Sequence, residues 1–232
     1  MKDKMRAENF LSIVRSLIKA KVFKKRIPLA VSWSLTFLCN QRCSYCDVWK
    51  YRKEELDLPQ VEKIIDELSC LGTKWISFTG GEPLLRSDLE SIIAYAKSKN
   101  IYVSVSTNGV LVPEKINILK LADKVKLSLD GPEDVHDRHR GQRSFRNVIG
   151  ALKCCRDNSI STCIQCVISG DNLDNLDYII GIAKGFGSQV SFQPGLQRKL
   201  WSDDLNPLAP SPDEYRKAIR HIMLRKRQGA PV

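Results

Sequence analysis

The segment "LAVSWSLTFLCNQRCSYCDVW", residues 29–49, joins a strand-like run to three closely spaced cysteines. Cys39, Cys43 and Cys46 follow one another in the pattern C-x3-C-x2-C. A structural zinc site usually takes four ligands in two separated pairs, whereas a [4Fe-4S] cluster held by three thiolates keeps one iron open. Because an open position is typical of a working metal site, the spacing predicts a reactive centre after the first strand.

Strand-like and helical segments alternate along the rest of the chain. The predicted strands are 29–37, 74–80, 101–109, 124–131, 160–169 and 189–195, and the predicted helices are 57–72, 87–100, 113–122, 144–158, 172–187 and about 212–227. Repeated βα units indicate a parallel sheet with right-handed crossovers. Six such units fit either an open doubly wound sheet or an incomplete eight-unit barrel, and both place chemistry in the loops after the strands.

The net charge of +11 is confined to the two ends of the chain. Residues 1–26 carry nine Lys or Arg and two Asp or Glu, and residues 213–232 carry six and two. The segment between them carries twenty-two of each kind and is neutral. Since a groove that follows a phosphate backbone normally has basic residues in the body of the fold, this distribution argues against nucleic-acid binding.

The basic N-terminal segment, residues 1–28, has the pattern of an amphipathic helix. Its apolar face carries Phe10, Ile13, Val14, Leu17 and Ile18. We expect this helix to pack on its own domain, to contact an anionic membrane surface or to bind a partner protein. The sequence shows neither a membrane-spanning apolar run nor a secretory signal, so we expect a cytoplasmic protein with reduced thiols, with peripheral membrane contact as an option.

Four further motifs follow the cysteine loop in a fixed order. They are "GGEP" (80–83), "STNG" (106–109), "SLDG" (128–131) and "DVHDRHRG" (134–141). The ordered set resembles the radical S-adenosylmethionine (radical SAM) superfamily over roughly residues 30–195, in the branch of molybdenum-cofactor biosynthesis protein A and the SPASM-domain enzymes.

The resemblance implies an α/β fold of a particular kind, a partial (β/α)6 TIM-like barrel with an extra N-terminal amphipathic helix. The barrel core would span residues 29–195, after the helix of residues 1–28. A linker and a helix would make up residues 196–232. The resembling enzymes continue into a C-terminal domain that often holds auxiliary clusters, so this chain is either a compact member or lacks that domain.

The resemblance also implies an enzyme with two cofactors, a [4Fe-4S] cluster and S-adenosylmethionine. Cys39, Cys43 and Cys46 would each ligate one iron, and the methionine part of S-adenosylmethionine would chelate the fourth. Reductive cleavage would give a 5′-deoxyadenosyl radical that abstracts hydrogen from a substrate, for which a peptide, a cofactor precursor and a lipid are the candidates. An electron donor such as flavodoxin or ferredoxin is the implied partner.

Residues near the cysteines and in the "GGEP" motif take roles from the same resemblance. Tyr45 is expected to pack near the adenine, with a core aromatic as the alternative. Gly80 and Gly81 are expected to let backbone approach a ligand closely. The strand edge at "GGEP" would bind the methionine amino group, and Glu82 would accept a hydrogen bond from that ammonium.

The ends of the third and fourth strands supply the remaining candidates. The resemblance implies that Thr107, Asn108 and Ser128 hold the ribose hydroxyls and the methionine carboxylate or line the substrate side, with Ser128 assigned to S-adenosylmethionine. Asp130 is expected to face substrate or to cap the following turn. Arg140 is interpreted as a cation for the methionine carboxylate or as a surface residue of a loop.

Other cysteines and histidines give weaker signals. Cys163 and Cys166 have an odd separation on one strand, so they point to opposite faces and cannot easily share a metal. His136 and His139 are interpreted as ordinary contacts of a polar loop. Three more cysteines lie in helical patterns and are expected to be small buried side chains, namely Cys70, Cys154 and Cys155.

A different class of function remains as the alternative at this point. The three cysteines with a distant fourth ligand, together with the basic ends, fit a non-enzymatic zinc- or nucleic-acid-binding protein. The lack of a fourth cysteine nearby, the neutral middle of the chain and the unexplained "GGEP" count against it.

Overall fold

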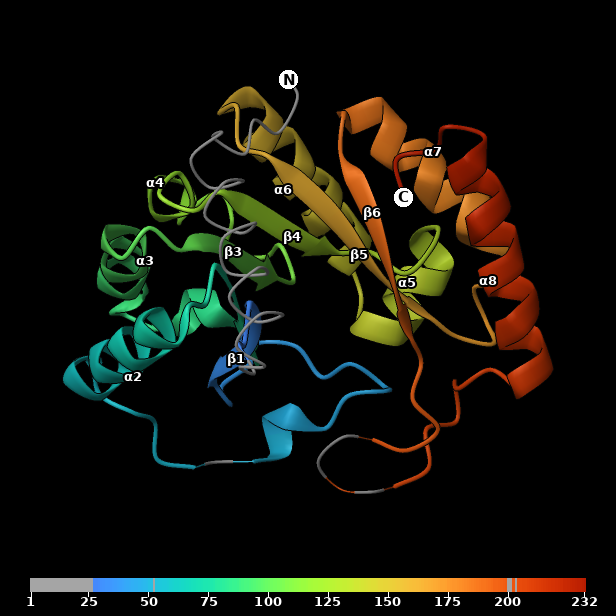
Figure 1. Ribbon diagram of the computed structural model, residues 1–232. Coiled ribbons are helices and arrows are strands. Elements are labelled where there is room, and N and C mark those ends of the chain that lie inside the picture. The colour runs from blue at the N-terminus through green and yellow to red at the C-terminus, as the bar shows by residue number, and fades with distance from the viewer. Residues whose placement is uncertain (1–26, 52, 200–201, 203) are drawn as a thin grey trace.

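The computed structural model describes residues 27–51, 53–199, 202 and 204–232. A single parallel sheet forms its centre, with strands in the order in which they occur in the chain (Figure 1). The strands are β1 (Ala30–Thr36), β2 (Trp75–Gly80), β3 (Tyr102–Thr107), β4 (Lys124–Ser128), β5 (Thr162–Ile168) and β6 (Gln189–Pro194). Because the order never reverses, the sheet has the arrangement of a partial barrel and differs from a doubly wound sheet.

Helices follow the strands and cover the outside of the curved sheet (Figure 1). They are α2 (Leu58–Leu71), α3 (Leu89–Ser98), α4 (Ile116–Leu119), α5 (Glu133–Arg140), α6 (Ser144–Asp157), α7 (Leu176–Phe186) and α8 (Pro212–Arg227). The N-terminal helix that the sequence predicts lies outside the described residues. Among the helices that are described, none has the length and apolarity needed to cross a membrane.

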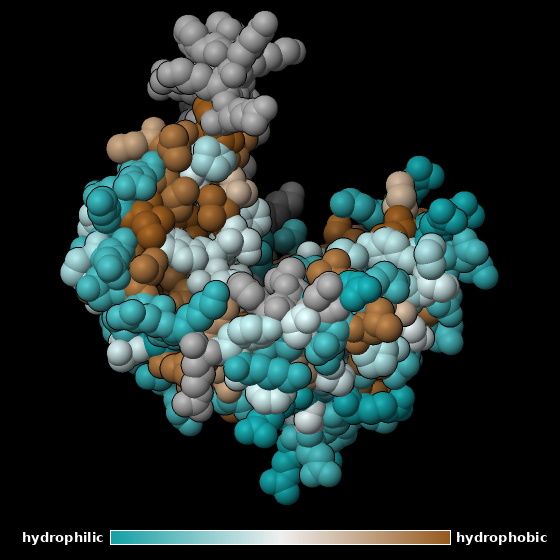
Figure 2. Space-filling view, turned by 90° about the horizontal axis from the view of Figure 1, so that it is seen from below, coloured by the Kyte–Doolittle hydropathy of each residue, from teal (hydrophilic) through white to brown (hydrophobic). Residues whose placement is uncertain are grey.

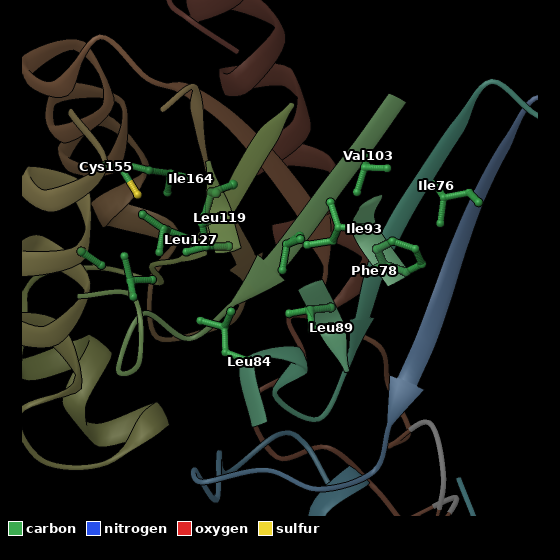
Figure 3. Close-up of a cluster of buried hydrophobic side chains, with 14 of the residues drawn as sticks. Ile76, Phe78, Leu84, Leu89, Ile93, Val103, Leu119, Leu127, Cys155 and Ile164 are labelled. Carbon is green, nitrogen blue, oxygen red and sulfur yellow. The ribbon is translucent and has the colours of Figure 1, made fainter. Parts of the chain in front are cut away.

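Side chains alternate between the two faces of each strand, and the two faces differ in chemistry. On β2, Ile76 and Phe78 are fully buried against the helices, while Ser77 lines a cavity on the opposite face. Figure 3 shows the outer apolar cluster, in which side chains from the strands meet those of the helices. The apolar face therefore holds the fold together, and the polar face lines a hollow. The space-filling view shows a notch between two lobes of the molecule (Figure 2).

Local sequence explains where the longest helices begin and end. Asp57 accepts a hydrogen bond from the backbone N–H of Gln60 at the start of α2, and Gly72 ends that helix with φ of 97°. Ser211 and Glu214 form the corresponding reciprocal pair at the start of α8. These caps satisfy backbone groups that the helical ladder leaves free, so they fix the helix ends without tertiary contacts.

Two expectations are wrong in the structure. The polar segment predicted as a loop forms helix α5, whose inner side buries Val135, His136 and His139. With Val135 as its only aliphatic side chain, the segment lacks the apolar period that identifies a helix in sequence. Cys70, expected to be buried, is exposed on α2, whereas Cys155 is fully buried.

Candidate active site

The loop after β2 is joined by backbone hydrogen bonds to the segment that leads into the cysteines. The N–H of Gly81 donates to the carbonyl oxygen of Thr36 over 2.7 Å, and the N–H of Glu82 donates to that of Leu38 over 2.7 Å. The cysteine loop therefore begins on a rigid edge, because its first residues continue the parallel pairing of β1 with β2.

Both glycines of "GGEP" are required by this close approach. A Cβ atom on Gly81 would lie 2.0 Å from the carbonyl oxygen of Leu38, and one on Gly80 would lie 2.4 Å from that of Thr36. Gly80 also has φ of 124°, a conformation that side chains disfavour. The sequence predicts that these glycines admit a ligand, whereas the backbone they approach in the structure is the protein's own.

Glu82 connects the "GGEP" loop to the end of β3. Its fully buried carboxylate accepts hydrogen bonds from the N–H groups of Leu84 (3.1 Å) and Asn108 (2.8 Å). Burial raises the pKa of Glu82 to about 7, and hydrogen bonds from Asn108, Thr107 and Leu84 oppose the rise. The contact of Glu82 with a methionine ammonium stays a prediction.

Asn108 extends the same connection to the cysteine loop. Its side-chain amide donates to the side-chain oxygen of Asn40 over 2.6 Å, and its own oxygen accepts from the N–H of Val110. The buried hydroxyl of Thr107 accepts from the N–H of Gly109. Thr107 and Asn108 thus hold three loops together, and their predicted contacts with S-adenosylmethionine stay predictions.

A buried ion pair fixes the other side of the cysteine loop. Nε of Arg140 lies 2.6 Å from Oδ2 of Asp130, and the two side chains are 9% and 0% exposed. The hydroxyl of Tyr45 donates to the same carboxylate oxygen over 2.8 Å. Burial acts to raise the pKa of Asp130, but the adjacent Arg140 guanidinium holds it below its usual range. Asp130 is therefore buried and paired within the fold, where the sequence predicts either a residue that faces substrate or a cap of the following turn.

Arg140 is buried and paired, so it is not the surface residue of a loop that one sequence interpretation gives. Its predicted contact with the methionine carboxylate stays a prediction. Its guanidinium lies over the ring of Tyr45, with Cζ 5.4 Å from the ring centroid. The N–H of Ser44 donates to the carbonyl oxygen of His139 over 2.9 Å. Helix α5 therefore clamps the cysteine loop through side-chain and backbone contacts.

The two histidines of α5 contact Asp130, a member of this ion pair, and Asp171 beside the helix. Nδ1 of His136 accepts a hydrogen bond from the N–H of Asp130 over 3.1 Å, so the neutral ring carries its proton on Nε2. Burial lowers the pKa of His136 to about 4. Nε2 of His139 lies 3.4 Å from Oδ2 of Asp171.

The three cysteines share one half-buried loop, and their chemistry suits a thiolate-ligated cluster. Burial raises the pKa of Cys39 and raises that of Cys43 to about 11, and nearby Arg140 opposes both shifts. A metal that binds here must therefore displace protons. The thiols of Cys39 and Cys43 face the Gln41 backbone and side chain, and in the described part of the chain no three potential ligands converge. The donor set fits three irons of a cluster, provided that the cysteine side chains rotate toward a common centre.

A cavity of about 500 Å³ opens beside this loop. Tyr45, Cys46 and Gly80 line one part of it, and Ser34 and Val167 line another. Its size falls within the range of small-molecule and cofactor sites. Residues predicted to bind the cofactors, from the cysteine loop and from "GGEP", therefore line the same cavity. Ser128 is the last residue of β4 and lies on the inner face of the sheet, in register with Gln165 of β5.

Some residues that organise the site carry no sequence signal. Arg86 is buried and donates to the carbonyl oxygens of Leu35 and Leu56, which lie far from it in sequence. The buried amide of Asn172 donates to the carbonyl oxygen of Asp130 over 2.8 Å. Neither belongs to a motif, and their partners become neighbours only when the chain folds.

Comparison with known protein families agrees with this geometry. The family model described as "Radical SAM superfamily" matches residues 33–181, which is more than half of the chain. The chain belongs to the radical SAM superfamily. Membership implies a [4Fe-4S] cluster and S-adenosylmethionine as its cofactors.

Two relatives illustrate the range of radical SAM enzymes that this chain resembles. It is 33% identical to mycofactocin maturase MftC of Mycolicibacterium smegmatis over 193 residues, covering 78% of this chain and 49% of the relative. It is 28% identical to Fe-coproporphyrin III synthase of Methanosarcina barkeri, covering 89% of this chain and 53% of the relative. The chain thus spans about half the length of the curated relatives it matches.

A solved structure shares the fold of this chain. Streptococcus suis SuiB bound to S-adenosylmethionine superimposes with a TM-score of 0.75 at 16% identity, covering 96% of this chain and 53% of SuiB. At this identity the likeness supports the architecture alone.

Proposed function

We propose that this chain forms the catalytic barrel of an enzyme that cleaves S-adenosylmethionine reductively at a [4Fe-4S] cluster. The observation that carries the proposal is the shared cavity of about 500 Å³, which places Cys46 and Tyr45 beside the "GGEP" edge at Gly80. When bound, the cluster supplies one electron to the sulfonium, which yields methionine and a 5′-deoxyadenosyl radical that abstracts hydrogen from the substrate.

Residues of the cysteine loop, of the "GGEP" edge and of the inner face of the sheet bind and orient the cofactors in this proposal. Cys39, Cys43 and Cys46 ligate three irons as thiolates. The backbone edge at Gly80 takes the methionine ammonium, and the ring of Tyr45 packs against the adenine. Ser128, on the inner face of β4, contacts the bound S-adenosylmethionine.

A second set of residues acts by holding the loops in place. Glu82 and Asn108 are hydrogen-bonded to each other across the "GGEP" and "TNG" loops, and Thr107 supports them. The Arg140 pair with Asp130 fixes Tyr45. These contacts support positioning roles for Glu82, Thr107, Asn108 and Arg140, because their polar atoms are already committed to other parts of the protein.

The substrate class is a peptide, a cofactor precursor or a lipid, and an electron donor such as flavodoxin or ferredoxin supplies the reductant. Among the structural neighbours, SuiB has been captured with a precursor peptide, and one of the sequence relatives is named as a haem synthase. The zinc- or nucleic-acid-binding alternative has no specific observation in its favour.

Anaerobic reconstitution tests the proposal directly. The wild-type chain is loaded with iron and sulfide, then given dithionite and S-adenosylmethionine, and 5′-deoxyadenosine is measured by mass spectrometry. We expect product from the wild type and from Cys70→Ala, whose exposed thiol lies outside the loop, and none from the Cys39→Ala, Cys43→Ala, Cys46→Ala triple variant. A chain that binds no cluster, or a triple variant that retains activity, would refute the proposal.

A further inference from the structure

The inner face of the sheet is polar, unlike the packed interior of a complete barrel. Bulky branched side chains usually fill a barrel interior. Here the inward positions of the first five strands carry mostly hydroxyl, amide and amine groups, namely Ser32, Ser34, Ser77, Thr79, Ser104, Ser106, Lys124, Lys126, Ser128 and Gln165. Burying polar groups costs free energy unless they gain partners, so this composition indicates a surface that meets a polar ligand.

A second cavity of about 480 Å³ lies toward the first residues of the strands. We call it the lower cavity, to distinguish it from the cavity of about 500 Å³ beside the cysteine loop. Both cavities are lined by Ser32, Thr79 and Gln193, so they are continuous parts of one interior. The lower cavity ends near Ala30 and Trp75, the first residues of β1 and β2. A substrate that reaches the cysteine end of the interior can therefore extend to this floor.

Lys126 supplies the only charge among the described residues that line the lower cavity. Its Nζ donates to the hydroxyl of Ser77 over 3.1 Å and lies 5.1 Å from the ring centroid of Trp75. The indole N–H of Trp75 is in turn held by the hydroxyl of Ser104 over 2.9 Å, which fixes the ring. Lys126 makes no ion pair with a carboxylate of the described residues.

The surroundings of Lys126 favour an anion. Burial lowers the pKa of its amine, and the neighbouring Lys124 lowers it further, while Cys163 acts in the opposite direction. A ligand with negative charge would relieve both effects by supplying a counter-charge. Ser77, Ser106 and Gln165 add neutral hydrogen-bond donors to the same wall, and none of the described lining residues of this cavity is acidic.

We propose that Lys126 and the hydroxyl groups around it form an anion site on the floor of the interior, which binds a carboxylate group of the substrate. The inference deepens the proposed function and rests on it in one respect, namely that the ligand is the substrate of the radical reaction. The site anchors the substrate at the end of the hollow opposite the cysteine loop, so that its reacting part lies toward the cluster.

Lysine-selective NMR tests the site without a known substrate. The full chain is reconstituted anaerobically after growth with lysine labelled with ¹³C at the ε carbon, and Lys126→Met identifies the Lys126 signal. Pentanoate, pentanamide and pentyl phosphate serve as probes at constant ionic strength. We expect pentanoate to shift the Lys126 signal saturably, pentanamide to leave it in place, and the exposed Lys153 to respond to neither.

Calorimetry with the same probes supplies the second measurement. Lys126→Met should weaken pentanoate binding by about tenfold or more, because a charged donor is lost, while Lys126→Arg should keep most of it and Lys153→Met all of it. A Lys126 signal that does not saturate with pentanoate, or that responds equally to chloride, would overturn the site. Saturation by pentyl phosphate alone would overturn the assignment to a carboxylate.

Failure of the anion site and failure of the proposed reaction have different signatures. The titrations require no cleavage of S-adenosylmethionine, so pentanoate binding without formation of 5′-deoxyadenosine would support the site and count against the reaction. If the chain forms 5′-deoxyadenosine but no probe shifts the NMR signal of Lys126, the reaction would be supported and the anion site refuted.

Discussion

Asp130→Asn would keep the shape of the buried side chain while removing the charge that pairs with Arg140. The wild-type carboxylate accepts from Nε of Arg140 (2.6 Å), the hydroxyl of Tyr45 (2.8 Å) and the N–H of Val167 (3.0 Å). An amide presents an N–H₂ group where one carboxylate oxygen was, so at least one donor faces another donor. The guanidinium, 9% exposed, would also lose its counter-charge.

The expected loss of stability follows from that burial. Removing one partner of a buried pair costs roughly 3–5 kcal/mol, because it leaves the other charge uncompensated. For a chain of this size, each kcal/mol lowers the melting temperature by about 2–4 °C, which gives a fall of about 6–20 °C. Tyr45 depends on the same carboxylate for its position, so the cysteine loop should also take up iron less completely.

An exposed pair of the same geometry provides the matched control. Nε of Arg146 lies 2.8 Å from Oε1 of Glu133, but the two side chains are 74% and 47% exposed. Glu133→Gln should therefore cost about 1 kcal/mol or less. Urea unfolding followed by circular dichroism at neutral pH measures both variants. If Asp130→Asn costs no more than Glu133→Gln, burial does not set the strength of the pair and the reasoning is wrong.

Three further predictions follow from other parts of the structure. Gly81→Ala should lower the free energy of unfolding by about 1–3 kcal/mol, since its Cβ must displace backbone. The control Gly150→Ala in α6, with open space around it, should leave the stability unchanged or raise it. Equal urea midpoints for the two variants would contradict this. The pKa of His136 falls from 6.5 to about 4 on folding. Between these pH values the unfolded chain binds a proton at His136 and the folded chain does not, so the free energy of unfolding decreases as pH falls from 6.5 toward 4. The loss reaches about 2 kcal/mol at pH 5, and His136→Asn should remove this part of the pH dependence of urea unfolding. Iodoacetamide should label the exposed Cys70 in the native protein but not the buried Cys155, whose pKa burial raises to about 12; mass spectrometry of digests that finds equal labelling would refute the burial pattern.

The helices and strands with strong local signals are the ones that sequence predicts well. The predicted helix over 57–72 becomes α2, because an Asp57 cap, an apolar face and Gly72 act within one segment. The boundaries of α4 are less accurate, since the structure keeps only Ile116–Leu119 of the predicted helix over 113–122. Helix α5 is missed because its buried side is made largely of histidines, and their burial depends on Asp130 and Phe145, which local periodicity cannot reveal.

The sequence by itself determined the order of the βα units, the three thiols of the cysteine loop and the glycines of "GGEP". Each is a local property, set by the spacing of residues along one short segment. The tertiary structure alone decided that Tyr45 meets Asp130 across 85 residues of chain. It also decided that Arg140 is buried and paired, and that Lys126 faces a hollow without an acidic neighbour among the described residues. Charges act through space, so the chemistry of a charged residue depends on which groups the fold brings within a few ångströms of it.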